Sequence, residues 1–279
     1  MKLGLKIFSV FTAVGMLIVL LQGSIVTNTG SGEGCGATWP LCFGEVVPQN
    51  PALATIIEYS HRLWSSLMGL CVLILAFWST KQLAHIRETK FIALMAVLFI
   101  VFQGLMGAGA VIWGNSGFIL ALHFGISTIS FSTVALLAVF SFEKNPLQWQ
   151  RGSVSKTYFW YLISVTVYSY MVIYTGAYIK HASYDITVQW IHRSAAVVLI
   201  LMIITLLVWS WKKYRYSILG HLSTSIFLLI VVQAFSGLVI VLNGSSLTTV
   251  LIHALTISVI FTIMIYMIIV VIRSRVLET

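Results

Sequence analysis

Four of the seven histidines lie inside long apolar segments, where an imidazole ring has few polar partners. They occur in "SHRLW", "ALHFG", "IHRSA" and "LIHAL", as His61, His123, His192 and His253. Each lies five or six residues from one end of its segment, at a depth of roughly 8–9 Å in a helix that rises about 1.5 Å per residue. An interhelical hydrogen bond commonly explains one membrane histidine, but four at one depth indicate a shared purpose.

Two imidazoles on different helices can bind the iron of a flat macrocycle from opposite faces. Histidine is a common axial ligand of haem iron, and helical bundles hold cofactors between facing helices. A zinc or copper site would need further ligands, and these segments contain no cysteine, aspartate or second histidine at ligand spacing. The pattern therefore predicts two haem sites with paired histidine ligands to iron: His61 with His123, and His192 with His253.

Arg62 and Arg193 directly follow two of these histidines. An arginine near the end of a membrane helix can extend to the interface, so contact with lipid phosphates is one interpretation. The other is that both guanidinium groups pair with haem propionates, because arginine binds carboxylates well. On the second interpretation we expect Arg62 and Arg193 to contribute to haem binding.

Glu58 lies three residues before His61, on the same face of the expected helix. The corresponding residue before His192 is Gln189, so two otherwise similar stretches differ in this acid. An ionisable residue in a membrane segment is a functional candidate, although Glu58 could also lie in water at the interface. We expect Glu58 and His61 to be catalytic, with Glu58 transferring protons or stabilising a positively charged carbon.

The elements that position these residues are membrane helices. Only 8% of the 279 residues are charged and 59% are hydrophobic, whereas soluble domains carry about 25% charge. A span needs roughly 20 apolar residues. Eight segments are long enough, at 7–27, 55–80, 91–112, 118–142, 157–179, 187–211, 218–241 and 247–272. The expected fold class is an all-α polytopic membrane protein.

The net charge of +9 comes mainly from the ends of these segments, so it indicates membrane orientation rather than nucleic-acid binding. One set of ends holds 13 of the 16 Lys and Arg residues, whereas the opposite loops hold only Lys180. Cytoplasmic loops are the positively charged ones. We therefore expect a multi-pass protein of the cell (plasma) membrane with both termini in the cytoplasm.

The second half of the chain repeats the first. At an offset of 130, Gln103, Gly107 and His123 correspond to Gln233, Gly237 and His253, and at an offset of 131 His61–Arg62 corresponds to His192–Arg193. Parallel repeats of this kind are related by a pseudo-two-fold axis along the membrane normal. We expect a four-helix half at 1–142, a cytoplasmic linker at 143–156 and a second four-helix half at 157–279. Small residues in these spans, such as Gly107 and Gly237, leave room for a ring or a close helix.

The longest outward loop contains Cys35 and Cys42, which flank "GATWPL". Outside the cytoplasm the environment is oxidising, so the pair is a candidate disulfide. A redox-active or metal-delivering pair is the alternative. The third cysteine, Cys71, lies inside the second span, and we expect it to pack in the core.

The motifs "TNTGSGEGCGATWPLC", "EYSHR", "ALHFG", "IHR" and "LIH" together resemble the haem A synthases of Gram-positive bacteria, over nearly the whole chain. The resemblance implies an eight-helix membrane enzyme that oxidises a methyl group of haem O to a formyl group, giving haem A for terminal oxidases. It implies haem O as the substrate between His61 and His123, beside the family's acid at Glu58. It also implies haem b at His192 and His253.

The loop cysteines of the family match Cys35 and Cys42. Some members carry a second pair in the outer loop of the second half, but "IKHASYDIT" has none, which argues against a redox role that needs two pairs. The alternatives are a dihaem cytochrome b that carries electrons, which does not explain the Glu58/Gln189 difference, and a haem transporter or chaperone. The expected partners are haem O, the lipid bilayer, an electron donor that the sequence does not identify and a haem O synthase.

Overall fold

The computed structural model describes residues 3–114, 116–143, 154–181 and 185–276. Within these ranges it contains eight long helices, each apolar enough to cross a membrane. They are α1 (Leu3–Asn28), α2 (Leu53–Gln82), α3 (Thr89–Trp113), α4 (Gly117–Phe142), α5 (Lys156–His181), α6 (Ile186–Tyr214), α7 (Ile218–Asn243) and α8 (Leu247–Val276). The eight predicted spans and the all-α membrane fold class are confirmed, and most helices extend a little beyond their predicted ends.

Two tight turns of similar sequence reverse the chain between neighbouring helices. Gly114 ends α3 with a φ of 92° and Gly244 ends α7 with a φ of 83°, values that glycine adopts without strain. The serines that follow, Ser116 and Ser246, each accept a hydrogen bond at 3.3 Å from the backbone N–H three residues later. Serine is a favoured residue at the start of a helix for this reason. These turns place α4 against α3 and α8 against α7.

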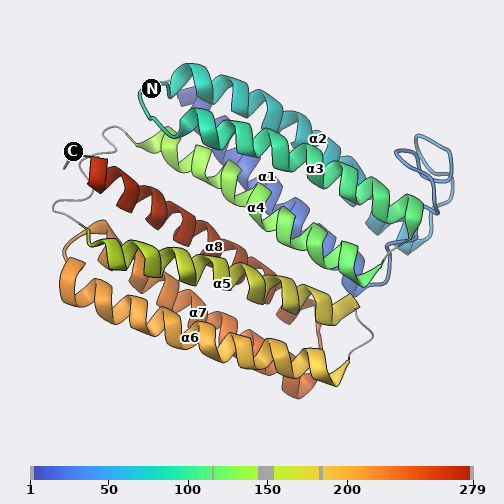
Figure 1. Cartoon of the computed structure of the whole chain (residues 1–279). Helices are drawn as coiled ribbons and strands as arrows, with labels where there is room; N and C mark the ends of the chain where they lie inside the picture. The colour runs from blue at the N-terminus through green and yellow to red at the C-terminus, as the bar shows by residue number, and fades with distance from the viewer. Residues whose placement is uncertain (1–2, 115, 144–153, 182–184, 277–279) are drawn as a thin grey trace.

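The helices form two groups of four that lie side by side (Figure 1). In the first group α1 packs against α2 and α4, and α3 packs against α2 and α4; α5 to α8 make the same set of contacts among themselves. The groups meet through α4, α5 and α8, and through α1 against α8. The halves at 1–142 and 157–279, and the axis that would relate them, stay predictions. Most of the linker predicted at 143–156 lies outside the described residues.

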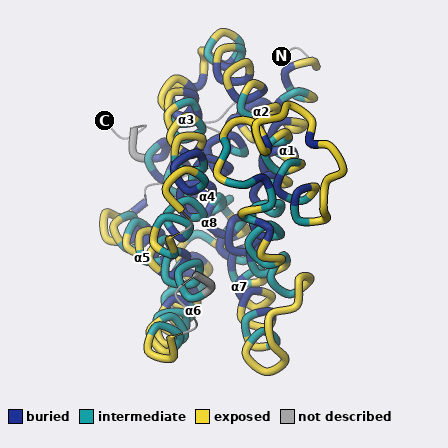
Figure 2. Tube along the Cα trace, turned by 90° about the vertical axis from the view of Figure 1, so that its right-hand side faces the viewer, coloured by how far each residue is buried: buried dark blue, intermediate teal, exposed yellow. Residues whose placement is uncertain are grey.

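The interior lies along α4 and α8, and exposed residues cover the outward faces of the other helices (Figure 2). Where the two groups meet, the hydroxyl of Ser132 on α4 lies 2.8 Å from that of Thr262 on α8. Small hydroxyl residues let membrane helices approach closely and hydrogen-bond to each other. Large apolar side chains on the outward faces, such as Phe77 (69% exposed) and Leu105 (65% exposed), suit contact with lipid.

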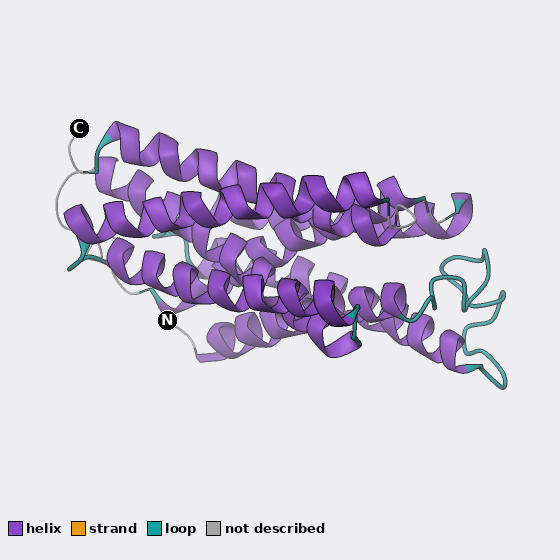
Figure 3. Ribbon diagram, turned by 90° about the horizontal axis from the view of Figure 1, so that it is seen from below, coloured by secondary structure: helices purple, strands orange, loops and turns teal. Residues whose placement is uncertain are grey.

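The two ends of the bundle differ. Helix α1 begins and α8 ends at one end, and the loop of residues 29–52 lies at the other (Figure 1). Figure 3 shows this loop projecting beyond the helices. We call the two ends the terminal end and the loop end.

A buried charge cluster at the terminal end joins residues from both groups of helices. Arg273 of α8 is 6% exposed, and its Nη1 donates to Oε2 of Glu143, just after α4, at 2.9 Å. Its Nε donates to Oε2 of Glu88, just before α3, at 3.2 Å, and the hydroxyl of Tyr266 donates to Oε1 of Glu143 at 2.6 Å. From the sequence, Arg273 is one of the basic residues that indicate membrane orientation, and no sequence pattern indicates this cluster.

Replacing Arg273 by methionine is expected to lower the free energy of unfolding by about 3–5 kcal/mol, because the buried carboxylate of Glu143 would lose its counter-charge. Unfolding in detergent, followed by circular dichroism, measures the change. Tyr266→Phe is the control, since it removes one hydrogen bond and should cost only about 1 kcal/mol. Adding Glu143→Gln to the Arg273→Met variant should restore part of the loss; equal, small effects of all the variants would contradict the role given to the cluster.

Candidate functional site

The four histidines of the apolar segments all lie near the loop end, on α2, α4, α6 and α8, and each ring is partly buried. His61 lies close enough to His123 for their charges to interact, and the same holds for His192 and His253. The structure therefore brings each of the two predicted pairs together, one in each group of four helices.

The sequence places the other three histidines, His85, His181 and His221, in or beside loops. His85 and His221 are exposed, and the side chain of His181 lies outside the described part of the chain. Cys71 is a free cysteine that is 8% exposed and packs in the core formed by α1 to α4.

A glycine on the preceding helix faces each of the four rings. If a β-carbon were added to the glycine, it would lie within van der Waals contact of the ring or closer. The pairs, with the distance from that β-carbon to Cε1 of the ring, are Gly23 with His61 (3.6 Å), Gly107 with His123 (3.6 Å), Gly176 with His192 (2.8 Å) and Gly237 with His253 (3.2 Å). Gly107 and Gly237 are predicted from the sequence to leave room for a ring, whereas Gly23 and Gly176 are not. In three of the pairs the glycine lies 16 residues before the histidine, and this spacing would have identified Gly176.

In the second group, a hydroxyl holds Nδ1 of each histidine. Oγ1 of Thr175 lies 3.1 Å from Nδ1 of His192, and Oγ of Ser236 lies 2.9 Å from Nδ1 of His253. Each hydroxyl already donates its only proton to a backbone carbonyl three residues earlier, at 3.0 Å for Thr175 and 2.9 Å for Ser236. With its proton on that carbonyl, each hydroxyl can accept from an Nδ1–H group. The tautomer that makes this bond has the lone pair on Nε2, which is the state that binds a metal.

In the first group, the same ring nitrogens have no partner. Nδ1 of His61 and Nδ1 of His123 are buried without a hydrogen bond, and so are Oε1 of Gln22 and Oε1 of Gln103. These four atoms come from α1, α2, α3 and α4, one from each helix. Buried polar atoms almost always have a partner in folded proteins. The first group therefore contains polar atoms that are available to a ligand, whereas the histidines of the second group are already held by the protein.

Glu58 and Arg62 form a buried ion pair next to His61. The guanidinium group of Arg62 donates to Oε1 of Glu58 through both Nε and Nη2, with the Nε contact at 3.0 Å. Oε2 of Glu58 accepts the backbone N–H of Cys35 at 2.8 Å. Because Glu58 is only 4% exposed, the alternative that it lies in water at the interface is not supported. The carboxylate is held from both sides, by a cation and by a backbone N–H.

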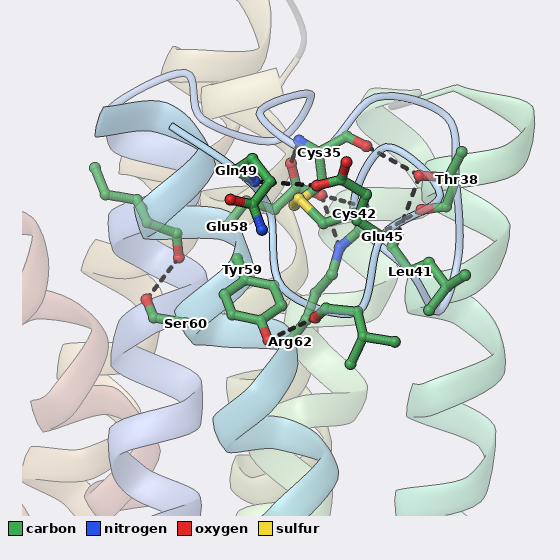
Figure 4. The surroundings of a disulfide bond; sticks show 12 residues. Cys35, Thr38, Leu41, Cys42, Glu45, Gln49, Glu58, Tyr59, Ser60 and Arg62 are labelled. Carbon is green, nitrogen blue, oxygen red and sulfur yellow. Dashed lines mark hydrogen bonds and ion pairs between the residues drawn. A yellow bond between two sulfur atoms is a disulfide. The ribbon is translucent and has the colours of Figure 1, made fainter. Parts of the chain in front are cut away.

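The loop of residues 29–52 is anchored on this ion pair (Figure 4). Cys35 and Cys42 form a disulfide, as predicted, and Nη1 of Arg62 donates to the carbonyls of Thr38 at 2.6 Å and Leu41 at 3.0 Å. The disulfide-closed ring therefore covers Glu58 and Arg62. Each of the three guanidinium nitrogens of Arg62 has a protein acceptor, so its pairing with a propionate stays a prediction that would require sharing these contacts.

Arg193 has a different environment in the second group. Its Nη2 donates to Oε1 of Gln189 at 2.9 Å, and its guanidinium lies 5.4 Å from the ring centre of Trp190. The neutral Gln189 thus takes the position of Glu58 without contributing a charge. A role for Arg193 in binding a propionate also stays a prediction.

The donor set of each histidine pair fits haem. Among the described residues, no three His, Cys, Asp or Glu side chains come together as a metal site. Each pair therefore offers two protein ligands, and a metal held there would take its other ligands from a bound group. Haem supplies four nitrogens from its macrocycle and accepts two axial histidines. The glycines opposite the rings and the unpartnered atoms of the first group are consistent with a ligand between the helices.

The fold and the site together define a polytopic membrane protein with two buried histidine pairs, of which only one has its Nδ1 atoms held by hydroxyls. Comparison with known proteins gives the family. Residues 6–186 match the family model described as "Cytochrome oxidase assembly protein".

The chain is 47% identical to the "Heme A synthase" of Halalkalibacterium halodurans, over 99% of both chains. It is 46% identical to the protein of that name from Alkalihalophilus pseudofirmus, over 96% of this chain and 98% of the relative. It is 40% identical to that of Bacillus licheniformis, over 99% of this chain and 98% of the relative. The chain therefore belongs to the cytochrome oxidase assembly family that contains these heme A synthases, and the resemblance seen in the sequence is confirmed.

Proposed function

We propose that this protein is a membrane oxidoreductase that oxidises a methyl group of haem O to a formyl group and so makes haem A. The relatives named heme A synthase match the chain along nearly its whole length, which supports this activity. The two halves are assigned different roles because their histidine pairs differ. One pair has its Nδ1 atoms held by hydroxyls, and the other has buried Nδ1 atoms without partners.

We assign haem b to His192 and His253. An axial histidine that keeps its place needs its other ring nitrogen hydrogen-bonded, because this contact sets the tautomer and the ring orientation. Thr175 and Ser236 supply that contact here. Haem b bound in this half would relay electrons.

We assign the substrate haem O to His61 and His123. Rings whose Nδ1 atoms are not held by the protein can adjust as a substrate enters and a product leaves. The unpartnered oxygens of Gln22 and Gln103 lie in the same group of helices and offer acceptors to a ligand. This half also contains Glu58, next to His61.

Glu58 is proposed as the catalytic acid–base group. Conversion of a methyl to a formyl group removes two hydrogens from the carbon and adds one oxygen: R–CH3 + H2O → R–CHO + 4 H⁺ + 4 e⁻. The oxygen would come from water, and a carboxylate beside the carbon can accept protons as they leave. The four electrons would pass to an external oxidant, either dioxygen or a membrane redox carrier. Arg62 and the N–H of Cys35 fix the orientation of Glu58, so that its carboxyl group could stabilise positive charge developing next to it.

The proposed setting is the plasma membrane, with the terminal end in the cytoplasm and the loop end outside. The basic residues near the terminal end support this orientation through the positive-inside rule. A disulfide at the loop end is typical of an oxidising compartment. The proposed partners are a haem O synthase that supplies the substrate and an electron donor.

Mass analysis of the haems extracted from the purified protein tests the proposed function. The protein is produced in a host that also makes haem O. We expect haem b together with an oxidised product, either the hydroxymethyl derivative of haem O or haem A. Haem b alone, with haem O present in the host membrane, would overturn the proposal in favour of an electron-carrying dihaem cytochrome b. Unmodified haem O as the only other haem would indicate a haem transporter or chaperone.

Replacing Thr175 by valine is expected to weaken haem b retention by about 10–100-fold, the usual effect of removing a partner of a metal-bound histidine. The electron paramagnetic resonance spectrum of the oxidised haem should shift as well, because the ring of His192 would be free to rotate. Thr175→Ser should restore both properties. Thr166→Val is the matched control, since Thr166 is buried in the same helix and its hydroxyl donates only to the carbonyl of Leu162. Equal haem retention in the Thr175 and Thr166 valine variants would refute the role of Thr175.

A further inference from the structure

Gln103 of α3 is a buried amide without a partner for its oxygen. The side chain is 7% exposed, and Oε1 accepts no hydrogen bond. Its counterpart in the repeat, Gln233 of α7, is buried to a similar degree, but its Oε1 has a hydroxyl partner. This is Thr256 on α8, which can donate its proton either to Gln233 or to the backbone carbonyl of Ile252. At the position that corresponds to Thr256, the first half has Ile126, which has no hydroxyl. Because the first half has Ile126 where the second has Thr256, Oε1 of Gln103 has no partner, whereas Oε1 of Gln233 has one.

Gln103 lies at the same depth in the membrane as one edge of a macrocycle bound between His61 and His123. Gly107 faces the ring of His123, and Gln103 lies four residues earlier, on the same face of α3 and about 6 Å closer to the terminal end at 1.5 Å per residue. His61 and His123 lie at similar depths on different helices, so a ring bound between them stands parallel to the helices. One edge of the ring then points to the loop end and the other to the terminal end, at the level of Gln103.

The cost of burying charge determines which edge of the haem faces the loop end and which faces the terminal end. Haem propionates favour the loop end, because His61 and His123 lie near that end and a charge deeper in the membrane is costly. The opposite edge, toward Gln103, is the edge at which haem O differs from haem b. Haem O carries there a farnesyl chain with a hydroxyl group on its first carbon, and haem b carries a vinyl group.

We propose that Gln103 accepts a hydrogen bond from this hydroxyl group and so makes the first half selective for haem O over haem b. The inference rests on the proposed function, whose substrate it discriminates. A site with a buried acceptor disfavours an analogue that lacks the donor, because the acceptor then stays unpaired. In the second half Thr256 satisfies Gln233, which matches a ligand with a vinyl group at this position.

Haem titration of the full-length protein, purified with haem b in its second half, tests this proposal. Haem O and haem b are added separately, and binding to the first half is followed by absorbance. We expect the unmodified protein to prefer haem O. Gln103→Leu should weaken haem O binding about tenfold and leave haem b binding unchanged. Ile126→Thr should have the same effect, since the new hydroxyl would occupy Gln103 as Thr256 occupies Gln233.

Gln233→Leu is the matched control in the second half, and it should leave the preference for haem O unchanged. A Gln103→Leu protein with normal haem b content and an unchanged preference would overturn the proposal. Thermal unfolding gives a second readout: without added haem O, Gln103→Leu should be at least as stable as the unmodified protein, because it removes an unpaired buried amide. A clear loss of stability would instead indicate a structural role and count against the inference. If the unmodified protein shows no preference and makes no oxidised haem, the proposed function itself fails.

Discussion

Glu58→Gln is expected to reduce haem A formation by a factor of about 10²–10⁴, the usual contribution of a general acid or base. Glutamine has nearly the same shape and can still accept the N–H of Cys35, but it cannot take up a proton as the carboxylate does. Haem b content should stay normal, because His192 and His253 lie in the other group of helices. Mass analysis of extracted haems measures both quantities in one sample.

The matched control for this variant is Glu45→Gln, which makes the same change at an exposed acid in the 29–52 loop. Because Glu58 pairs with Arg62, unfolding in detergent must be compared as well, to separate catalysis from stability. A folded Glu58→Gln protein that makes normal amounts of haem A would remove Glu58 from the mechanism. The second half already contains glutamine at the corresponding position, Gln189, which agrees with the expectation that only the first half does chemistry.

His253→Ala is expected to remove haem b from the purified protein almost completely. Loss of a residue that only supports a metal ligand commonly costs 10–100-fold in affinity, so loss of the ligand itself should cost more than about 100-fold. Haem O added to this variant should still bind in the first half, at His61 and His123. Formation of haem A should fall with the loss of haem b, because electrons would lose their path.

His123→Ala is the reciprocal variant. It should keep haem b at the level of the unmodified protein and lose binding of added haem O. Haem b and haem O are counted separately after extraction, so each variant reports on both halves. If either variant lost both haems to the same degree, the two pairs would not act as separate sites and the assignment of ligands would be wrong.

The sequence by itself determines the membrane fold and the candidate residues. A chain that crosses lipid must satisfy its backbone hydrogen bonds within each segment, so a long apolar run has to be a helix. All eight spans could be predicted for this reason. The equal depth of the four histidines also follows from sequence, because position along a helix converts directly into distance. Aligning the two halves at an offset of 131 is enough to show that Gln189 corresponds to Glu58.

Only the tertiary structure decides how the side chains of different helices meet. Hydropathy reports that a segment spans the membrane but not which of its faces packs against a neighbour, so no local pattern predicts that Thr175 and Ser236 hold two of the histidines. The placement of Glu58 under the backbone of Cys35 depends on how a long loop folds back on α2. Likewise, only the packing shows that Oε1 of Gln103 has no partner while Oε1 of Gln233 meets a hydroxyl from another helix. Such contacts depend on packing between segments far apart in the chain, and periodicity within one segment carries no information about them.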